Sequence, residues 1–165
     1  MTMQSNPALY VRSRTRRYEP ATTEQVLQAA QLIVDARMQR GMSFSDPNAA
    51  CDFFRDKLGG REREVFAAVF LDTRHRLIEF VELFHGTIGG TEVHPREVVR
   101  SALRCNAAAV IVAHNHPSGD VEPSAADRAL TVRLKQALAL VDVRLLDHVI
   151  VGGQQTLAMA AHGWV

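Results

Sequence analysis

Four apolar runs of strand length, separated by helical patterns and turns, constrain the fold of this chain more than any other feature. They lie at residues 64–71, 77–84, 107–113 and 143–151. Such near-continuous runs are typical of strands that are covered on both faces of a sheet. The sequence therefore predicts an α/β fold in which a mixed sheet is flanked by helices.

Helical spacing and capping signals occur around these runs. They predict helices at residues 22–41, 46–59, 95–103 and 124–140, and a short final strand is expected after Gly153. The first two helices precede the strands, which suggests a small N-terminal helical cap. We therefore expect three regions: a flexible basic N-terminal segment (1–20), an N-terminal helical region (21–60) and a metal-binding α/β domain (61–165).

Composition and charge limit the classes of partner. The net charge is only +1, which gives little of the electrostatic attraction expected of a DNA-binding protein. Basic residues gather only at Arg12–Arg17. This run could contact phosphates, but a short basic run near the N-terminus is more often a solvated tail. The two cysteines, Cys51 and Cys105, show no pairing signature, which favours a reducing compartment. With no apolar run of membrane-spanning length, we expect a cytoplasmic protein without membrane contact.

The segment from His114 to Asp127 carries the residues most able to do chemistry. His114 and His116 are two residues apart at the end of a predicted strand, so an extended backbone places both imidazoles on one side. Asp127 lies in the first turn of the next predicted helix, and a short loop would return it to the strand end. Two histidines and a carboxylate with one open position are typical of a catalytic zinc site.

A purely structural interpretation of this segment competes with the metal site. Ser124 and Asp127 form a capping box, and the intervening residues are ordinary turn formers. Two histidines at a strand end also find hydrogen-bond partners in many proteins. Each of these features alone favours a purely structural role. Their combination within fourteen residues favours a metal-binding site. For Asp147 and His148 in the last long strand, support of the metal ligands competes with a plain role as strand residues, and the plain role is favoured.

The same segment resembles the JAMM motif of MPN/JAB-domain metalloproteases, which is His-x-His, seven residues, Ser, two residues, Asp. From about Asp46 onward the chain resembles, more narrowly, the RadC family of bacterial JAB-domain proteins. The resemblance implies a JAB/MPN fold with layers like those of cytidine deaminases, and one Zn²⁺ bound by His114, His116 and Asp127. It also implies that Glu64, rather than Glu62, is the general base, and that Ser124 stabilises the oxyanion.

Two functions follow from the resemblance. The first is a zinc-dependent metallopeptidase or isopeptidase that cleaves an amide bond in an unknown protein or peptide, with other divalent metals as substitutes. The alternative is a DNA-repair-associated accessory protein with a metal site and no proteolytic role. Against the alternative, we expect a short form that lacks the N-terminal helix-hairpin-helix region of longer members. Nucleic-acid binding has little support, a two-metal nuclease has less, and a homodimer is possible.

Overall fold

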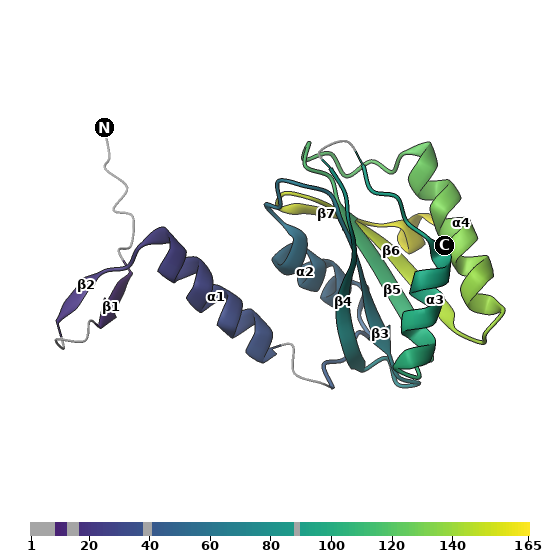
Figure 1. The fold of residues 1–165 in the computed structure, drawn as a ribbon, viewed down its shortest axis with the longest axis horizontal. Coiled ribbons are helices and arrows are strands. Elements are labelled where there is room, and N and C mark those ends of the chain that lie inside the picture. The colour runs from purple at the N-terminus through teal and green to yellow at the C-terminus, as the bar shows by residue number, and fades with distance from the viewer. Residues whose placement is uncertain (1–8, 13–16, 38–40, 88–89) are drawn as a thin grey trace. The chain divides into compact units, whose positions relative to one another are not determined.

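The computed structural model describes residues 9–12, 17–37, 41–87 and 90–165, and the chain divides into two compact units between Gln39 and Arg40. In the first unit, strands β1 (Tyr10–Arg12) and β2 (Tyr18–Pro20) pair in antiparallel fashion and helix α1 (Thr23–Arg37) follows (Figure 1). The sequence suggests irregular structure over residues 1–20, and this is wrong for these two strands. Backbone pairing, which the side-chain pattern does not report, forms them. Residues 13–16 of the basic run lie outside the described ranges.

Two helices of the N-terminal half begin at the capping residues that the sequence indicates. The Thr22 hydroxyl accepts a hydrogen bond from the Gln25 amide (3.2 Å), and the Gln25 side-chain oxygen accepts one from the Thr22 amide (2.9 Å). Helix α2 (Pro47–Leu58) begins after Asp46, whose carboxylate accepts from the Asn48 amide (2.9 Å). These contacts satisfy amides that have no partner inside the helix. None of the described helices is long and apolar enough to cross a membrane.

A five-stranded mixed sheet forms the centre of the second unit, which spans residues 40–165. Its strands lie in the order β4-β3-β5-β6-β7, and only β5 and β6 are parallel. The strands are β3 (Val65–Leu71), β4 (Leu77–His85), β5 (Ala109–Asn115), β6 (Arg144–Gly152) and β7 (Gln155–Ala158). The remaining elements are helices α3 (Pro95–Arg104) and α4 (Ala125–Ala139) and the 3₁₀ helix η1 (Met159–His162). The predicted α/β class and mixed sheet are confirmed.

Helices cover both faces of this sheet (Figure 1). On one face, Phe66 and Phe70 of β3 pack in a buried cluster with Val98 of α3 and Leu134 of α4. On the other face lies α2, whose Phe53 and Phe54 rings contact Phe80 of β4. All seven residues of β3 are buried, as expected of a strand covered on both sides. Helix α2 thus belongs to the unit that contains the sheet, so the predicted 21–60 region spans the division between the two units.

The connection from β5 through α4 to β6 positions the candidate site. Parallel neighbours need a crossover, and α4 supplies it; the N-terminus of α4 follows the C-terminal end of β5 after a loop of nine residues, 116–124. The apolar pattern predicts that β5 ends at Ala113, but the strand continues through His114 and Asn115, which pair with Ile150 and Val151. That expected end is therefore wrong. Backbone pairing continues where the apolar side chains stop, and polar side chains enter the interior.

Candidate metal centre

His114 and His116 bring their rings together at the C-terminal end of β5. His114 is buried, with 1% of its surface exposed, and His116 lies just beyond the strand. The His116 amide donates to the Val151 carbonyl (2.9 Å), which keeps the backbone extended past the last strand residue. The two Nε2 atoms are consequently 2.9 Å apart. The i, i+2 spacing thus places both rings on one side, as the sequence predicts.

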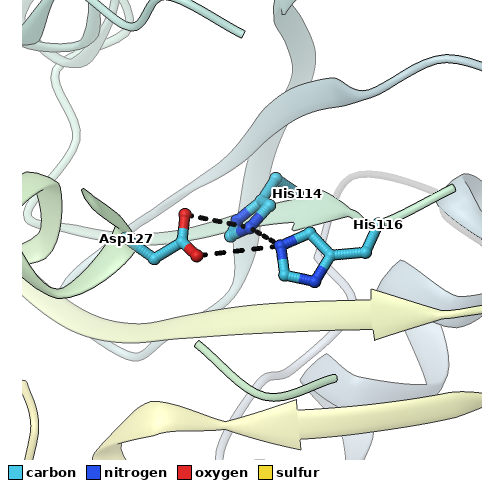
Figure 2. A group of neighbouring side chains, drawn as sticks. All are labelled: His114, His116 and Asp127. Carbon is cyan, nitrogen blue, oxygen red and sulfur yellow. Dashed lines mark hydrogen bonds and ion pairs between the residues drawn. The ribbon is translucent and has the colours of Figure 1, made fainter. Parts of the chain in front are cut away.

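Asp127 faces both rings from the first turn of α4 (Figure 2). Its Oδ1 lies 3.2 Å from His114 Nε2, and its Oδ2 lies 3.7 Å from His116 Nε2. The same carboxylate accepts from the Ser124 amide (2.8 Å), while the Ser124 hydroxyl accepts from the Asp127 amide (3.1 Å). The predicted capping box is therefore present, and it holds the carboxylate in the orientation that faces the histidines.

The donor set fits a divalent cation. Ligand atoms of His114, His116 and Asp127 all lie within 4.8 Å of one another. A tetrahedral zinc ion with ligands at about 2.0–2.1 Å separates its ligand atoms by roughly 3.3 Å. The observed separations of 2.9, 3.2 and 3.7 Å bracket that value. The group formed by His114, His116 and Asp127 can therefore hold a metal ion. Imidazole and carboxylate ligands suit a divalent metal such as zinc.

The electrostatics of the three residues favour a negative Asp127 carboxylate beside a neutral His114 ring. Burial opposes ionisation of Asp127, but the interaction with His116, the proximity of His114 and the hydrogen bonds from Ser124 outweigh it and lower its pKa. Burial lowers the pKa of His114 to about 4, so this ring is neutral at pH 7. Interaction with the Asp127 carboxylate raises the pKa of His116 against the opposing effect of burial.

Glu64 and Ser124 line a cavity beside the three proposed ligands. The cavity has a volume of about 350 Å³, and His116 and Asp127 also line it. Glu64 is partly buried, whereas Glu62 is exposed. Burial is the main cause that raises the pKa of Glu64, and the negative charge of Asp127 adds to it, while His116 opposes it. A carboxylate with a raised pKa near a metal site is suited to proton transfer.

Asn115 is a supporting residue that the sequence interpretation missed. It lies between the two histidines and is 2% exposed. Its Oδ1 accepts from the Val65 amide (2.8 Å), and its Nδ2 donates to the Arg63 carbonyl (3.0 Å). It therefore holds the backbone on both sides of Glu64. The sequence did contain a sign of this role. Asn115 is a polar residue next to a buried strand, and the alternation of side chains along a strand points it away from His114 and His116.

We expect Asn115→Ala to lower the free energy of unfolding by about 1–3 kcal/mol, because it leaves the buried Val65 amide and the part-buried Arg63 carbonyl without this partner. Urea denaturation followed by circular dichroism measures the change. Asn48→Ala, in the exposed first turn of α2, is the matched control and should change this free energy by less than about 0.5 kcal/mol. Equal values for the two variants would show that Asn115 does not hold the Glu64 segment.

His148, for which the sequence favours a plain strand role, contacts one of the proposed ligands. It is completely buried on β6, and its Nε2 lies 2.8 Å from Nδ1 of His114. Burial lowers the pKa of His148 well below its ordinary value. Asp147, by contrast, has the structural role that the sequence suggests, because its Oδ1 accepts from the Ala160 amide (2.9 Å) in η1.

The loop that carries His116 packs closely on the end of β6. Nδ1 of His116 donates to the Asp120 carbonyl (2.8 Å), which orients the ring from within the loop. Gly152 lies beneath the same loop, where a Cβ atom would collide with the Gly119 carbonyl and the Val121 side chain. Glycine is therefore required at this close approach of two backbone segments.

Comparison with known proteins agrees with this fold and geometry. A family model described as the RadC-like JAB domain matches residues 44–164. A protein of Xylella fastidiosa strain 9a5c named "UPF0758 protein" is 60% identical over 130 residues, which cover 79% of this chain and 58% of that relative. The "UPF0758 protein" of Vibrio cholerae is 53% identical over 145 residues, which cover 88% of this chain and 91% of the relative.

This chain spans somewhat more than half the length of the Xylella relative. A protein of the same name from Xanthomonas campestris strain 8004 gives a similar match, with 59% identity over 128 residues that cover 57% of its length. The Vibrio relative, in contrast, is matched over nearly its whole length. The family model covers most of this chain, including all three proposed ligands. The chain therefore belongs to the RadC-like JAB-domain family.

Proposed function

We propose that this chain is a zinc-dependent amide hydrolase of the metallopeptidase or isopeptidase type. The observation that carries the proposal is the convergence of His114, His116 and Asp127 on one point beside a cavity that Glu64 and Ser124 also line. When bound there, a zinc ion supplies Lewis acidity, which polarises a carbonyl and lowers the pKa of water. Membership of the JAB family, which includes metalloisopeptidases, supports the proposal.

Glu64 would act as the general base and acid. Its carboxylate would take a proton from the attacking water and then deliver it to the nitrogen of the departing amine. Burial raises the pKa of Glu64, which makes the second transfer easier than for an exposed carboxylate. Asn115 would keep this carboxylate in place by holding the backbone on both sides of Glu64.

Ser124 would stabilise the negative charge that develops on the substrate oxygen. Its hydroxyl lies at the N-terminus of α4 and lines the same cavity as Glu64. Helix N-termini favour nearby negative charge, since their first amides lack partners within the helix. The hydroxyl donates its one proton to Asp127 in the structure, so it would exchange this hydrogen bond for one to the substrate oxygen during the reaction.

The proposal predicts metal-dependent cleavage of peptides. Zinc-loaded protein should hydrolyse members of a fluorescence-quenched peptide library, and 1,10-phenanthroline should reduce the rate to the background of the uncatalysed reaction. Added zinc should restore the rate, because the chelator removes the ion without altering the chain. Cleavage that persists in full after verified metal removal would contradict the mechanism. Isopeptide-linked lysine peptides in the same library would separate a peptidase from an isopeptidase.

A further inference from the structure

Behind His114, away from the proposed metal, three buried groups form a continuous chain of hydrogen bonds. Nδ1 of His114 lies 2.8 Å from Nε2 of His148, and Nδ1 of His148 lies 2.6 Å from Oγ1 of Thr131. The Thr131 hydroxyl in turn donates to the backbone carbonyl of Asp127 (2.7 Å). Thr131 and His148 are both 0% exposed and His114 is 1% exposed. The chain thus begins at one proposed ligand and ends at another.

The direction of each hydrogen bond follows from the carbonyl at one end. A carbonyl only accepts, so the single hydroxyl proton of Thr131 is used on Asp127. Nδ1 of His148 must then donate to the Thr131 oxygen. The His148 ring is fully buried, and among the described residues its two nitrogens contact His114 and Thr131 and no carboxylate. A ring in such a place is neutral, so its Nε2 carries no proton and accepts from His114. Nδ1 of His114 is therefore the protonated nitrogen, and its Nε2 keeps a free lone pair.

The opposite direction fits poorly. If Thr131 donated to His148, the hydroxyl lone pairs would face the Asp127 carbonyl oxygen at 2.7 Å without a proton between them. His148 would then donate to His114, and the proton of His114 would move to Nε2. That proton would point into the space between His116 and Asp127, where the lone pair is needed for a metal.

We propose that Thr131 and His148 are positioning residues that keep His114 in the tautomer able to bind the metal. Neither residue is among the three proposed ligands or lines the cavity that contains Glu64 and Ser124. Their effect passes through His114, whose ring orientation and tautomer they determine together. The same chain anchors the backbone of Asp127, so the strand-borne and helix-borne ligands keep a constant relative position. This inference rests on the metal centre of the proposed function, and it does not depend on hydrolysis.

Nuclear magnetic resonance tests the tautomer directly in the metal-free protein. Long-range ¹H–¹⁵N correlation spectra of histidine-labelled protein distinguish a proton on Nδ1 from one on Nε2. We expect His114 and His148 to be Nδ1-protonated in the unsubstituted chain. In Thr131→Val, His148 has lost the acceptor for Nδ1–H, so both rings should shift toward the Nε2-protonated form. An unsubstituted chain with His114 protonated at Nε2 overturns the proposal.

Zinc affinity supplies the second readout. Thr131→Val, which preserves side-chain shape without the hydroxyl, should weaken zinc binding by about 10–100-fold, the usual effect of losing a partner of a ligating histidine. Thr131→Ser retains the hydroxyl and should bind zinc within about threefold of the unsubstituted chain. Competition with a fluorescent zinc indicator measures both values, and thermal melting confirms that each variant folds.

The two measurements separate this inference from the metal proposal itself. If the unsubstituted chain binds no zinc, the proposed function fails, while the tautomers still decide the orientation of the hydrogen-bond chain. If it binds zinc and Thr131→Val binds equally well with His114 still protonated at Nδ1, the metal site stands and the positioning role is refuted. A loss of stability without a change of tautomer would show that Thr131 is only a packing residue.

Discussion

Replacing His116 with alanine is expected to reduce the zinc content of the purified protein from about one ion per chain to nearly none. The substitution removes one of three proposed ligands, so affinity should fall by more than the roughly 10–100-fold that follows loss of a ligand's hydrogen-bonding partner. His116 lies in a loop, and 18% of its side-chain surface is exposed. Truncation of the ring therefore leaves the packed core intact, and the loss of metal should occur in a folded protein.

Elemental analysis after dialysis against metal-free buffer gives the stoichiometry, and circular dichroism confirms the fold. His85→Ala is the matched control, since His85 is an exposed histidine at the end of β4 that is not among the three candidate ligands. The control should retain about one ion per chain. A His116→Ala protein that keeps a full equivalent of zinc would place the metal elsewhere and would remove the basis of the proposed hydrolase.

Replacing Glu64 with glutamine should lower the turnover number by about 10²–10⁴-fold, the usual contribution of a positioned general acid–base group. Glutamine has nearly the same shape but neither accepts nor delivers a proton at this position. Because Glu64 is not among the three proposed ligands, zinc content should remain at about one ion per chain. A loss of turnover with retained metal separates proton transfer from metal binding.

Glu62→Gln provides the control within the same charged run. Glu62 is exposed and does not line the cavity that contains Glu64, His116 and Asp127. Its substitution should leave turnover within about twofold, as expected for a solvated acid far from the reacting atoms. Both variants are assayed with a peptide from the library that the unsubstituted chain cleaves. Undiminished turnover by Glu64→Gln would exclude this residue as the base.

Local sequence patterns were sufficient for most of the fold. The apolar runs predicted β3, β4, β5 and β6, because most of their side chains pack in the core, and β3 and β5 are buried along their whole length. Ser124 predicted the start of α4, since capping depends on residues only three positions apart. The same locality explains why the facing rings of His114 and His116 could be anticipated from an i, i+2 spacing at a strand end.

Predictions were less accurate wherever the outcome depended on backbone pairing. The extension of β5 through Asn115 and the pairing of β1 with β2 are examples. Both result from hydrogen bonds between main chains, which every residue except proline provides as donor and acceptor. The pattern of side chains predicts such pairing only where the paired strand also buries an apolar face. At these two places it does not, so the sequence alone underestimated the strands.

The sequence by itself determined the residue types of the candidate site, namely two imidazoles, a carboxylate and a nearby glutamate with the spacing of a known motif. Tertiary structure alone decided which residues support them. Thr131 and His148 reach His114 only because α4 crosses from β5 to a parallel β6, and Asn115 reaches the Glu64 segment across fifty positions of chain. Such contacts join elements distant in sequence, and their distances are set by packing and strand register, which leave no local periodicity to read.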